Sequence, residues 1–196
     1  MAEKHLFPWW GGWFLLNPLR KFYTDPKKLF KNYVKEGMTV LDLGCAMGFF
    51  SLPIAEMTGP SGKVICIDLQ KQMLNVLSRR SARSGLSGVI EVRQCTAETL
   101  DIDDLKASAG FALAFGVVHE TLNERKFITE VYDALQSGGI FFMAEPSGHV
   151  TEEKFNENVD IALKEGFSVK EYRHHRYYRG AVLEKQQGES GPNAGD

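Results

Sequence analysis

The stretch Val40-Leu-Asp-Leu-Gly-Cys-Ala-Met-Gly-Phe-Phe50 decides the fold that we expect for this chain. Its first residues are apolar apart from Asp42, as in a strand that is buried on both faces. Gly44 and Gly48 follow at once, and glycine lets a backbone turn tightly and approach a ligand closely. The stretch therefore predicts a buried strand that runs into a nucleotide-binding turn.

The rest of the chain alternates apolar runs with amphipathic segments. The apolar runs predict strands near 38–43, 63–67, 89–93, 111–116 and 139–145. The amphipathic segments predict helices near 25–34, 48–58, 70–84, 123–136 and 151–165. Two last runs, 167–173 and 180–185, predict a closing antiparallel hairpin. We expect an α/β, doubly wound, mostly parallel seven-stranded sheet with helices on both faces.

Charge and cysteine content exclude several classes of protein. The 23 basic and 25 acidic residues leave a formal net charge of -2, so no general field attracts a polyanion, and nucleic acid is an unlikely partner. Cys45, Cys66 and Cys95 form no Cys-x-x-Cys pair, which favours neither a disulfide framework nor a metal site. No apolar run approaches the ~20 residues that span a bilayer. We expect one cytoplasmic domain over 25–185.

The two ends of the chain differ from this domain. The segment 1–24 holds all three tryptophans, and such large aromatic side chains must cover something. A lid over the ligand site, packing against the sheet edge and contact with a dimer partner are all compatible with this segment. Its neighbouring lysines also fit a membrane surface, which we favour less. The tail 186–196 has no core-forming side chain and is expected to be disordered.

Two carboxylates are placed where a doubly wound sheet binds nucleotides, beyond the carboxyl ends of its strands. Asp42 ends the first strand and can accept hydrogen bonds from an ammonium group. Asp68 ends the second strand, where a carboxylate can accept both hydroxyls of a ribose. Each could instead cap the helix that follows it. Their joint order at strand ends favours the nucleotide site.

These residues resemble the Asp-x-Gly-x-Gly-x-Gly signature of the class I S-adenosylmethionine-dependent methyltransferases. Asp42, Gly44 and Gly48 match it, Asp68 stands at the family's ribose position, and the resemblance extends over roughly residues 35–185. It implies S-adenosyl-L-methionine as cofactor and methyl transfer to a small-molecule acceptor. The cofactor-binding residues that it implies are Asp42, Gly44, Cys45, Gly48, Asp68, Leu69, Thr96, Ala97, Glu98 and Phe115.

Two departures from the family pattern affect this expectation. Ala46 replaces the middle glycine of the signature and should not easily adopt a positive φ. Thr96 stands where an acidic residue commonly binds the adenine amine, so that amine would be read by the Thr96 hydroxyl, by Glu98 or by a backbone carbonyl. These departures motivate the alternative of a cofactor-binding protein without catalysis.

His119, just past the fourth strand, is the candidate catalytic residue. A near-neutral pKa would suit proton removal from a hydroxyl or amine, although a helix-entry histidine bonded to backbone is the structural alternative. The residues expected to contact substrate are Glu145, His149, Trp9, Trp10 and Trp13, and Glu145 could equally anchor a loop.

Two further alternatives stay open at this point. No Asn/Asp-Pro-Pro-Tyr/Phe motif follows the fourth strand and no Pro-Cys pair occurs, which speaks against methylation of nucleic-acid bases. The basic and aromatic segment 173–179 still leaves RNA as an alternative partner, against a solvated hairpin. Thiol-dependent arsenic chemistry, through cysteines on the expected ligand loops, is a remote alternative.

Overall fold

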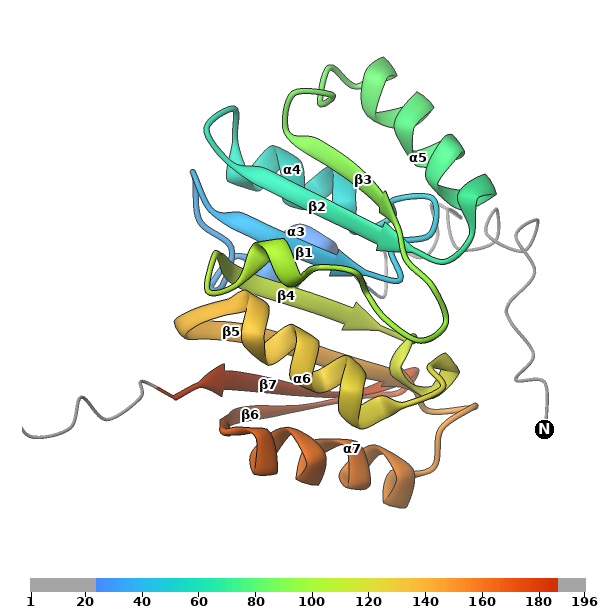
Figure 1. Ribbon diagram of the computed structural model, residues 1–196, viewed down its shortest axis with the longest axis vertical. Helices are drawn as coiled ribbons and strands as arrows, with labels where there is room; N and C mark the ends of the chain where they lie inside the picture. The colour runs from blue at the N-terminus through green and yellow to red at the C-terminus, as the bar shows by residue number, and fades with distance from the viewer. Residues whose placement is uncertain (1–23, 187–196) are drawn as a thin grey trace, which may run out of the picture.

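The structure is a computed structural model that describes residues 24–186 and contains one sheet with the strand order β3-β2-β1-β4-β5-β7-β6 (Figure 1). The strands are β1 (Thr39–Leu43), β2 (Lys63–Asp68), β3 (Ile90–Gln94), β4 (Ala109–Phe115), β5 (Leu135–Pro146), β6 (Phe167–His175) and β7 (Tyr178–Lys185). All pairs among β1 to β5 are parallel, and β7 runs antiparallel to both β5 and β6. The expected fold class and the closing hairpin are confirmed.

Helices cover both faces of the sheet. They are α3 (Pro26–Phe30), α4 (Ser51–Thr58), α5 (Lys71–Arg83), α6 (Glu124–Ala134) and α7 (Glu152–Glu165), with short 3₁₀ turns at Asp103–Leu105 and Val118–Glu120. One buried apolar core joins α3, α4 and α5 to the sheet through Phe30, Ile54 and Leu77. A second core on the opposite face joins α6 and α7 to it through Val131 and Val159. The sheet is therefore shielded from water on both sides, as near-continuous apolar strands require.

Several expected element boundaries were wrong by a few residues, for local reasons. Helix α4 begins at Ser51 rather than near 48, because Gly48 has a φ of 82° that no helix residue adopts. Strand β5 begins at Leu135 rather than near 139, since Leu135 pairs with Ala109 before a register shift. The first helix, expected over 25–34, is helical only over Pro26–Phe30.

The strand order creates the crevice that positions the site. The chain leaves β1 toward β2 and β3 on one side and returns to β4 on the other, so β1 and β4 flank the point where the order reverses. Loops leaving the carboxyl ends of these two strands diverge and leave room for a ligand between them.

The segments 1–23 and 187–196, which include most of the expected lid and tail, lie outside the described residues. Among the described helices, none is long and apolar enough to cross a membrane.

Candidate active site

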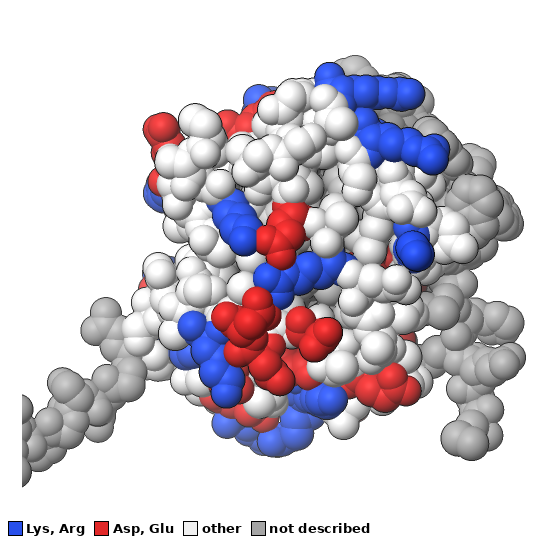
Figure 2. All heavy atoms as spheres, turned by 45° about the horizontal axis from the view of Figure 1, so that its top comes forward, with Lys and Arg blue, Asp and Glu red and all other residues white. Residues whose placement is uncertain are grey.

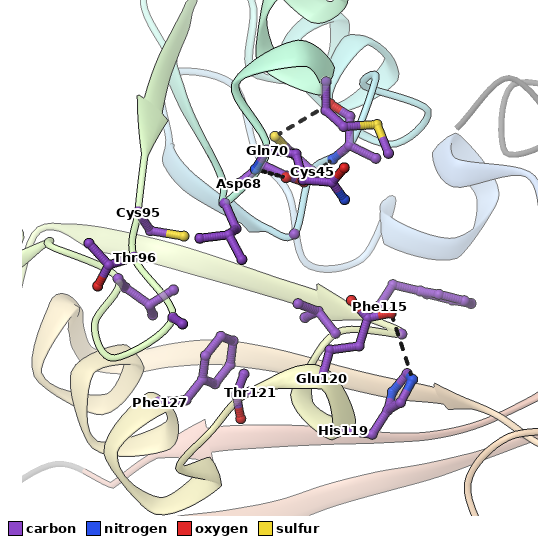
Figure 3. Close-up of a pocket in the computed structure, with 18 of the residues that line it drawn as sticks. Cys45, Asp68, Gln70, Cys95, Thr96, Phe115, His119, Glu120, Thr121 and Phe127 are labelled. Carbon is purple, nitrogen blue, oxygen red and sulfur yellow. Dashed lines mark hydrogen bonds and ion pairs between the residues drawn. The ribbon is translucent and has the colours of Figure 1, made fainter. Parts of the chain in front are cut away.

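A cavity of about 810 Å³ lies at the carboxyl ends of the parallel strands (Figure 3). The loops after β1, β2, β3, β4 and β5 line it, together with Phe127 and Glu130 of α6. Its position is that of the crevice at the reversal of strand order. The cavity is therefore the place in which to look for the predicted ligand residues.

Most of the predicted residues meet in this cavity. Those that line it are Gly44, Cys45, Asp68, Leu69, Thr96, Ala97, Glu98, Phe115, His119 and His149. Asp42, Gly48 and Glu145 do not line it, although Gly48 packs against α5 and Glu145 binds His119, both of which contribute to the lining. The predicted substrate residues Trp9, Trp10 and Trp13 lie outside the described residues.

Asp68 holds the turn after β1 in shape. Its Oδ2 accepts the N–H of Ala46 at 2.9 Å, and its Oδ1 accepts the N–H of Gln70 at 2.8 Å. Burial raises the pKa of Asp68, and the two backbone N–H groups lower it. Because a carboxylate oxygen has two lone pairs, each oxygen keeps one for a ligand hydroxyl. Gln70 is the residue before α5, so Asp68 holds the chain at the entry to this helix and does not cap an N–H group within it.

Ala46 corrects one expectation. It does adopt a positive φ, 46°, at the position of the family's middle glycine. A left-handed conformation costs an alanine about 1–2 kcal/mol, and the hydrogen bond to Asp68 offsets part of that cost. The turn thus keeps its shape without the glycine.

Asp42 lies beneath the turn rather than in the cavity. Its side chain is 2% exposed, and its Oδ2 accepts the Ser51 hydroxyl at 2.5 Å. Burial raises its pKa to about 7, against the lowering effect of Ser51, and the negative charge of Asp68 adds to the rise. Asp42 therefore ties β1 to the start of α4, and its contact with an ammonium group stays a prediction.

The buried Asp42 predicts a pH-dependent stability. Its pKa rises from an ordinary 3.8 to about 7 on folding, so the folded protein holds a proton that the unfolded chain releases between these values. The free energy of unfolding is expected to fall as the pH rises from about 4 to 7. Asp42→Asn should flatten this decline in urea unfolding at pH 5 and pH 8. The exposed Asp160→Asn serves as control, and a decline as steep in Asp42→Asn as in the parent would contradict the assignment.

The two signature glycines have different functions. A Cβ on Gly44 would lie 2.7 Å from Cγ2 of Val117, so the missing side chain lets the turn approach the loop after β4. A Cβ on Gly48 would lie 2.8 Å from Cδ1 of Leu52 and also collide with Leu77 of α5. Gly44 borders the cavity, whereas Gly48 allows the turn to pack against helices.

The loop after β3 is fixed by hydrogen bonds to its own backbone and to α6. The Thr96 hydroxyl oxygen accepts the N–H groups of Glu98 and Thr99, each at 3.3 Å. Glu130 of α6 accepts the Thr99 hydroxyl at 2.7 Å and the Leu100 N–H at 2.7 Å. Because the Thr96 oxygen is already an acceptor twice, Glu98 or a backbone carbonyl is the better acceptor for an adenine amine.

His119 is held by a buried carboxylate. Its Nδ1 lies 2.6 Å from Oε2 of Glu145, and its backbone N–H donates to Oε1 of the same residue at 3.2 Å. Glu145, on β5, is 1% exposed, whereas the His119 side chain is 26% exposed. On the other side of the ring, Nε2 lies 4.0 Å from Oε1 of Glu120 (Figure 3). The geometry is that of an oriented imidazole with one nitrogen toward the cavity wall.

The comparison with known families agrees with this geometry. A family model described as a methyltransferase domain matches residues 34–187. The chain belongs to this methyltransferase family. Together with the strand order and the turn after β1, the match confirms the expected class I S-adenosylmethionine-dependent methyltransferase fold.

Relatives of this methyltransferase include the ubiquinone/menaquinone biosynthesis C-methyltransferase UbiE of Escherichia fergusonii. The two are 30% identical over 119 residues, which is 61% of this chain and 47% of the relative. The chain thus spans about half the length of the curated relatives that it matches. A protein of the same name from Salmonella arizonae is also 30% identical over 119 residues.

Solved structures share the fold. An S-adenosylmethionine-dependent methyltransferase from Aquifex aeolicus superposes with a TM-score of 0.81 at 24% identity, covering 92% of this chain and 100% of that one. An arsenic(III) S-adenosylmethionine methyltransferase from Chlamydomonas reinhardtii superposes with a TM-score of 0.64 at 19% identity, covering 81% and 66%. At these identities the likeness extends to the fold alone.

The cavity of the methyltransferase fits the family's cofactor. Asp68 keeps acceptor capacity for ribose hydroxyls, and Gly44 keeps the turn close to the cavity without a side chain in the way. The apolar side chains of Leu69 and Met73 line the same end, where a flat base requires apolar contact.

The thiols of the methyltransferase do not favour arsenic chemistry. Burial raises the pKa of Cys45 well above its usual range, and the neighbouring Cys66 raises it further. Burial likewise raises the pKa of Cys95 to about 11. A thiolate is the form that binds soft ions, so both residues behave as packing groups at neutral pH. The part of the chain that the structure describes also holds no cluster of three or more His, Cys, Asp or Glu suited to a metal.

Sequence reasoning missed several residues of the site. Phe49 and Phe50 line the cavity directly after the turn, and the Phe50 and Phe115 rings lie 4.9 Å apart. Phe127 and Glu120 also line it. The two phenylalanines directly after the glycine turn were a usable sequence signal for residues of the cavity wall. Phe127 gave none, because its apolar position on α6 is equally typical of a core residue.

Proposed function

We propose that this methyltransferase transfers a methyl group from S-adenosylmethionine to a small-molecule acceptor, with His119 as the general base. The observation that carries the proposal is the pairing of His119 with the buried Glu145 at the wall of the cavity. When bound, S-adenosylmethionine supplies an electrophilic methyl group at its sulfonium centre.

The chain's own residues would hold the cofactor at one end of the cavity. Asp68 would accept the two ribose hydroxyls, using the lone pairs left by its contacts with Ala46 and Gln70. The turn at Gly44 would face the amino-acid portion, and Glu98 would accept the adenine amine. Accurate placement of the acceptor beside the methyl group supplies much of the acceleration in such displacements.

His119 would remove a proton from the acceptor. The carboxylate of Glu145 favours the imidazole tautomer with its proton on Nδ1, because that N–H can then donate to Oε2. In that tautomer the lone pair that would accept the proton is on Nε2. The imidazolium that forms is stabilised by the nearby negative charge, since Glu145 is 1% exposed and little screened by water.

The acceptor that fits best is a hydroxylated aromatic ring. Phe49, Phe50, Phe115 and Phe127 give the cavity apolar walls suited to ring contacts. Proton loss from a ring hydroxyl makes either its oxygen or a ring carbon nucleophilic, so the same base serves O- or C-methylation. The name of the UbiE relatives, C-methyltransferases of ubiquinone/menaquinone biosynthesis, supports this class.

RNA is the weaker candidate. In the hairpin, Arg173 pairs with Glu171 at 2.8 Å and Arg179 lies 3.8 Å from Glu152, so these cations are partly neutralised. On the face in Figure 2, acidic side chains gather below the centre and basic ones are spread around them. A surface of this kind gives little attraction for a phosphate backbone.

The test is a screen for release of S-adenosylhomocysteine with hydroxylated aromatics, amines and RNA as acceptors. We expect turnover with hydroxylated aromatics and a ~100-fold or larger loss in His119→Ala, the scale of a general base. His174→Ala, at an exposed position on β6 outside the cavity lining, is the matched control and should keep most of the activity. Full turnover in His119→Ala would assign that residue to structure. Cofactor binding without transfer to any acceptor would favour the non-catalytic alternative.

A further inference from the structure

The charged side chains that line the cavity are acidic. Four carboxylate residues line it, Asp68, Glu98, Glu120 and Glu130, and its lining within the described residues includes neither Lys nor Arg. Asp68 is engaged with the turn, and Glu130 with the loop after β3. Glu98, in the loop after β3, is assigned above to the adenine amine. Glu120 therefore stands out, because the cofactor and base assignments above give it no function.

Glu120 lies beside His119 in the lining of the cavity. It follows His119 in the 3₁₀ turn after β4, and its side chain is 27% exposed. In Figure 3, Glu120 and His119 lie on the side of the cavity opposite to Asp68. Burial raises the pKa of Glu120, His119 lowers it, and the charges of Asp68 and Glu145 raise it again. The carboxyl group is thus within electrostatic range of both ends.

With the assignments proposed above, the positive sulfur of the cofactor would lie in the same region. The sulfonium is one carbon away from the ribose, and its methyl group must meet the acceptor. If Asp68 bound the ribose and His119 faced the acceptor, the sulfonium would lie in the space between these two residues. Glu120 borders that space.

We propose that Glu120 selects the charged sulfonium of S-adenosylmethionine over the neutral thioether of S-adenosylhomocysteine. The inference rests on the proposed function, because it uses the positions assigned there to ribose and acceptor. A carboxylate attracts a cation more strongly in a half-buried site than in water. Methyl transfer converts the sulfonium into a thioether and removes this attraction. The product is then held less tightly than the substrate cofactor.

The experiment measures binding by titration calorimetry, so it needs no acceptor. Three ligands are compared: S-adenosylmethionine, S-adenosylhomocysteine, and sinefungin, which has a protonated amine in place of the methylated sulfonium. The parent should bind both cations more tightly than the thioether. Glu120→Gln should weaken both cations about fivefold to tenfold and change the thioether less than about twofold.

Two further variants serve as controls for this measurement. Glu120→Asp retains the charge and should keep most of the preference for cations. Glu98→Gln removes a carboxylate elsewhere in the same cavity and should leave the ratio of affinities unchanged. A ratio in Glu120→Gln equal to that of the parent would overturn the inference and leave the proposed function standing. Failure of the parent to bind any of the three ligands would overturn the cofactor assignment itself.

Discussion

Asp68→Ala is expected to weaken the binding of S-adenosylmethionine about 100-fold or more. Each ribose hydroxyl bound to the carboxylate contributes roughly 1.5–3 kcal/mol, as hydrogen bonds to charged groups do, and two such bonds are lost together. The substitution also removes the acceptor that holds the N–H of Ala46, so the turn that borders the cavity loosens. Titration calorimetry on the purified variant measures the loss directly.

Two controls separate this effect from a general loss of structure. Asp68→Asn keeps one acceptor oxygen and should fall between the parent and Asp68→Ala. Asp104→Asn replaces an exposed acid that binds Arg93 away from the cavity, and should bind like the parent. An affinity in folded Asp68→Ala within about twofold of the parent would show that this carboxylate does not bind the ribose.

Glu145→Gln is expected to lower kcat about 100-fold or more while leaving the affinity for S-adenosylmethionine nearly unchanged. An amide that turns its NH₂ group toward Nδ1 of His119 favours the tautomer with its proton on Nε2, where the base must be unprotonated. It also removes the charge that stabilises the imidazolium. Loss of a partner that orients a functional histidine costs 10- to 100-fold or more in known sites.

The tautomer of His119 distinguishes a positioning role of Glu145 from a purely structural one. Nitrogen NMR of the parent should show the proton on Nδ1, and Glu145→Gln should shift it toward Nε2. Glu152→Gln, an exposed acid on α7, is the matched control and should change neither kcat nor the tautomer. An unchanged tautomer together with an unchanged kcat in Glu145→Gln would remove Glu145 from the mechanism.

The sequence by itself determined the fold class and one half of the site. Strand and helix periods are local properties, so the alternation after Val40 was sufficient to predict a doubly wound sheet. The turn at Gly44 and the carboxylate of Asp68 were predictable as well, because parallel strands bring their carboxyl ends to one edge. The structure places both residues at the cavity.

Side-chain direction was decided only by the tertiary structure. Asp68 is the last residue of β2 and Asp42 the last but one of β1, yet Asp42 lies beneath the turn and contacts Ser51 while Asp68 lies at the cavity edge. Asp42 pairs with Cys66, two residues before Asp68, so both carboxylates lie on the same face of the sheet but Asp42 lies deeper, under the turn. Ala46 likewise adopts its positive φ because Asp68 binds its N–H.

The pairing of His119 with Glu145 also belongs to the tertiary structure. The two residues are 26 positions apart, on the loop after β4 and on β5, and they meet because those strands are neighbours in register. Sequence reasoning identified His119 as a candidate base and assigned Glu145 to the substrate or to a loop. No local pattern distinguishes a carboxylate that points into a cavity from one buried against a histidine. Only the packed sheet fixes that direction, because burial and partner depend on contacts between segments remote in sequence.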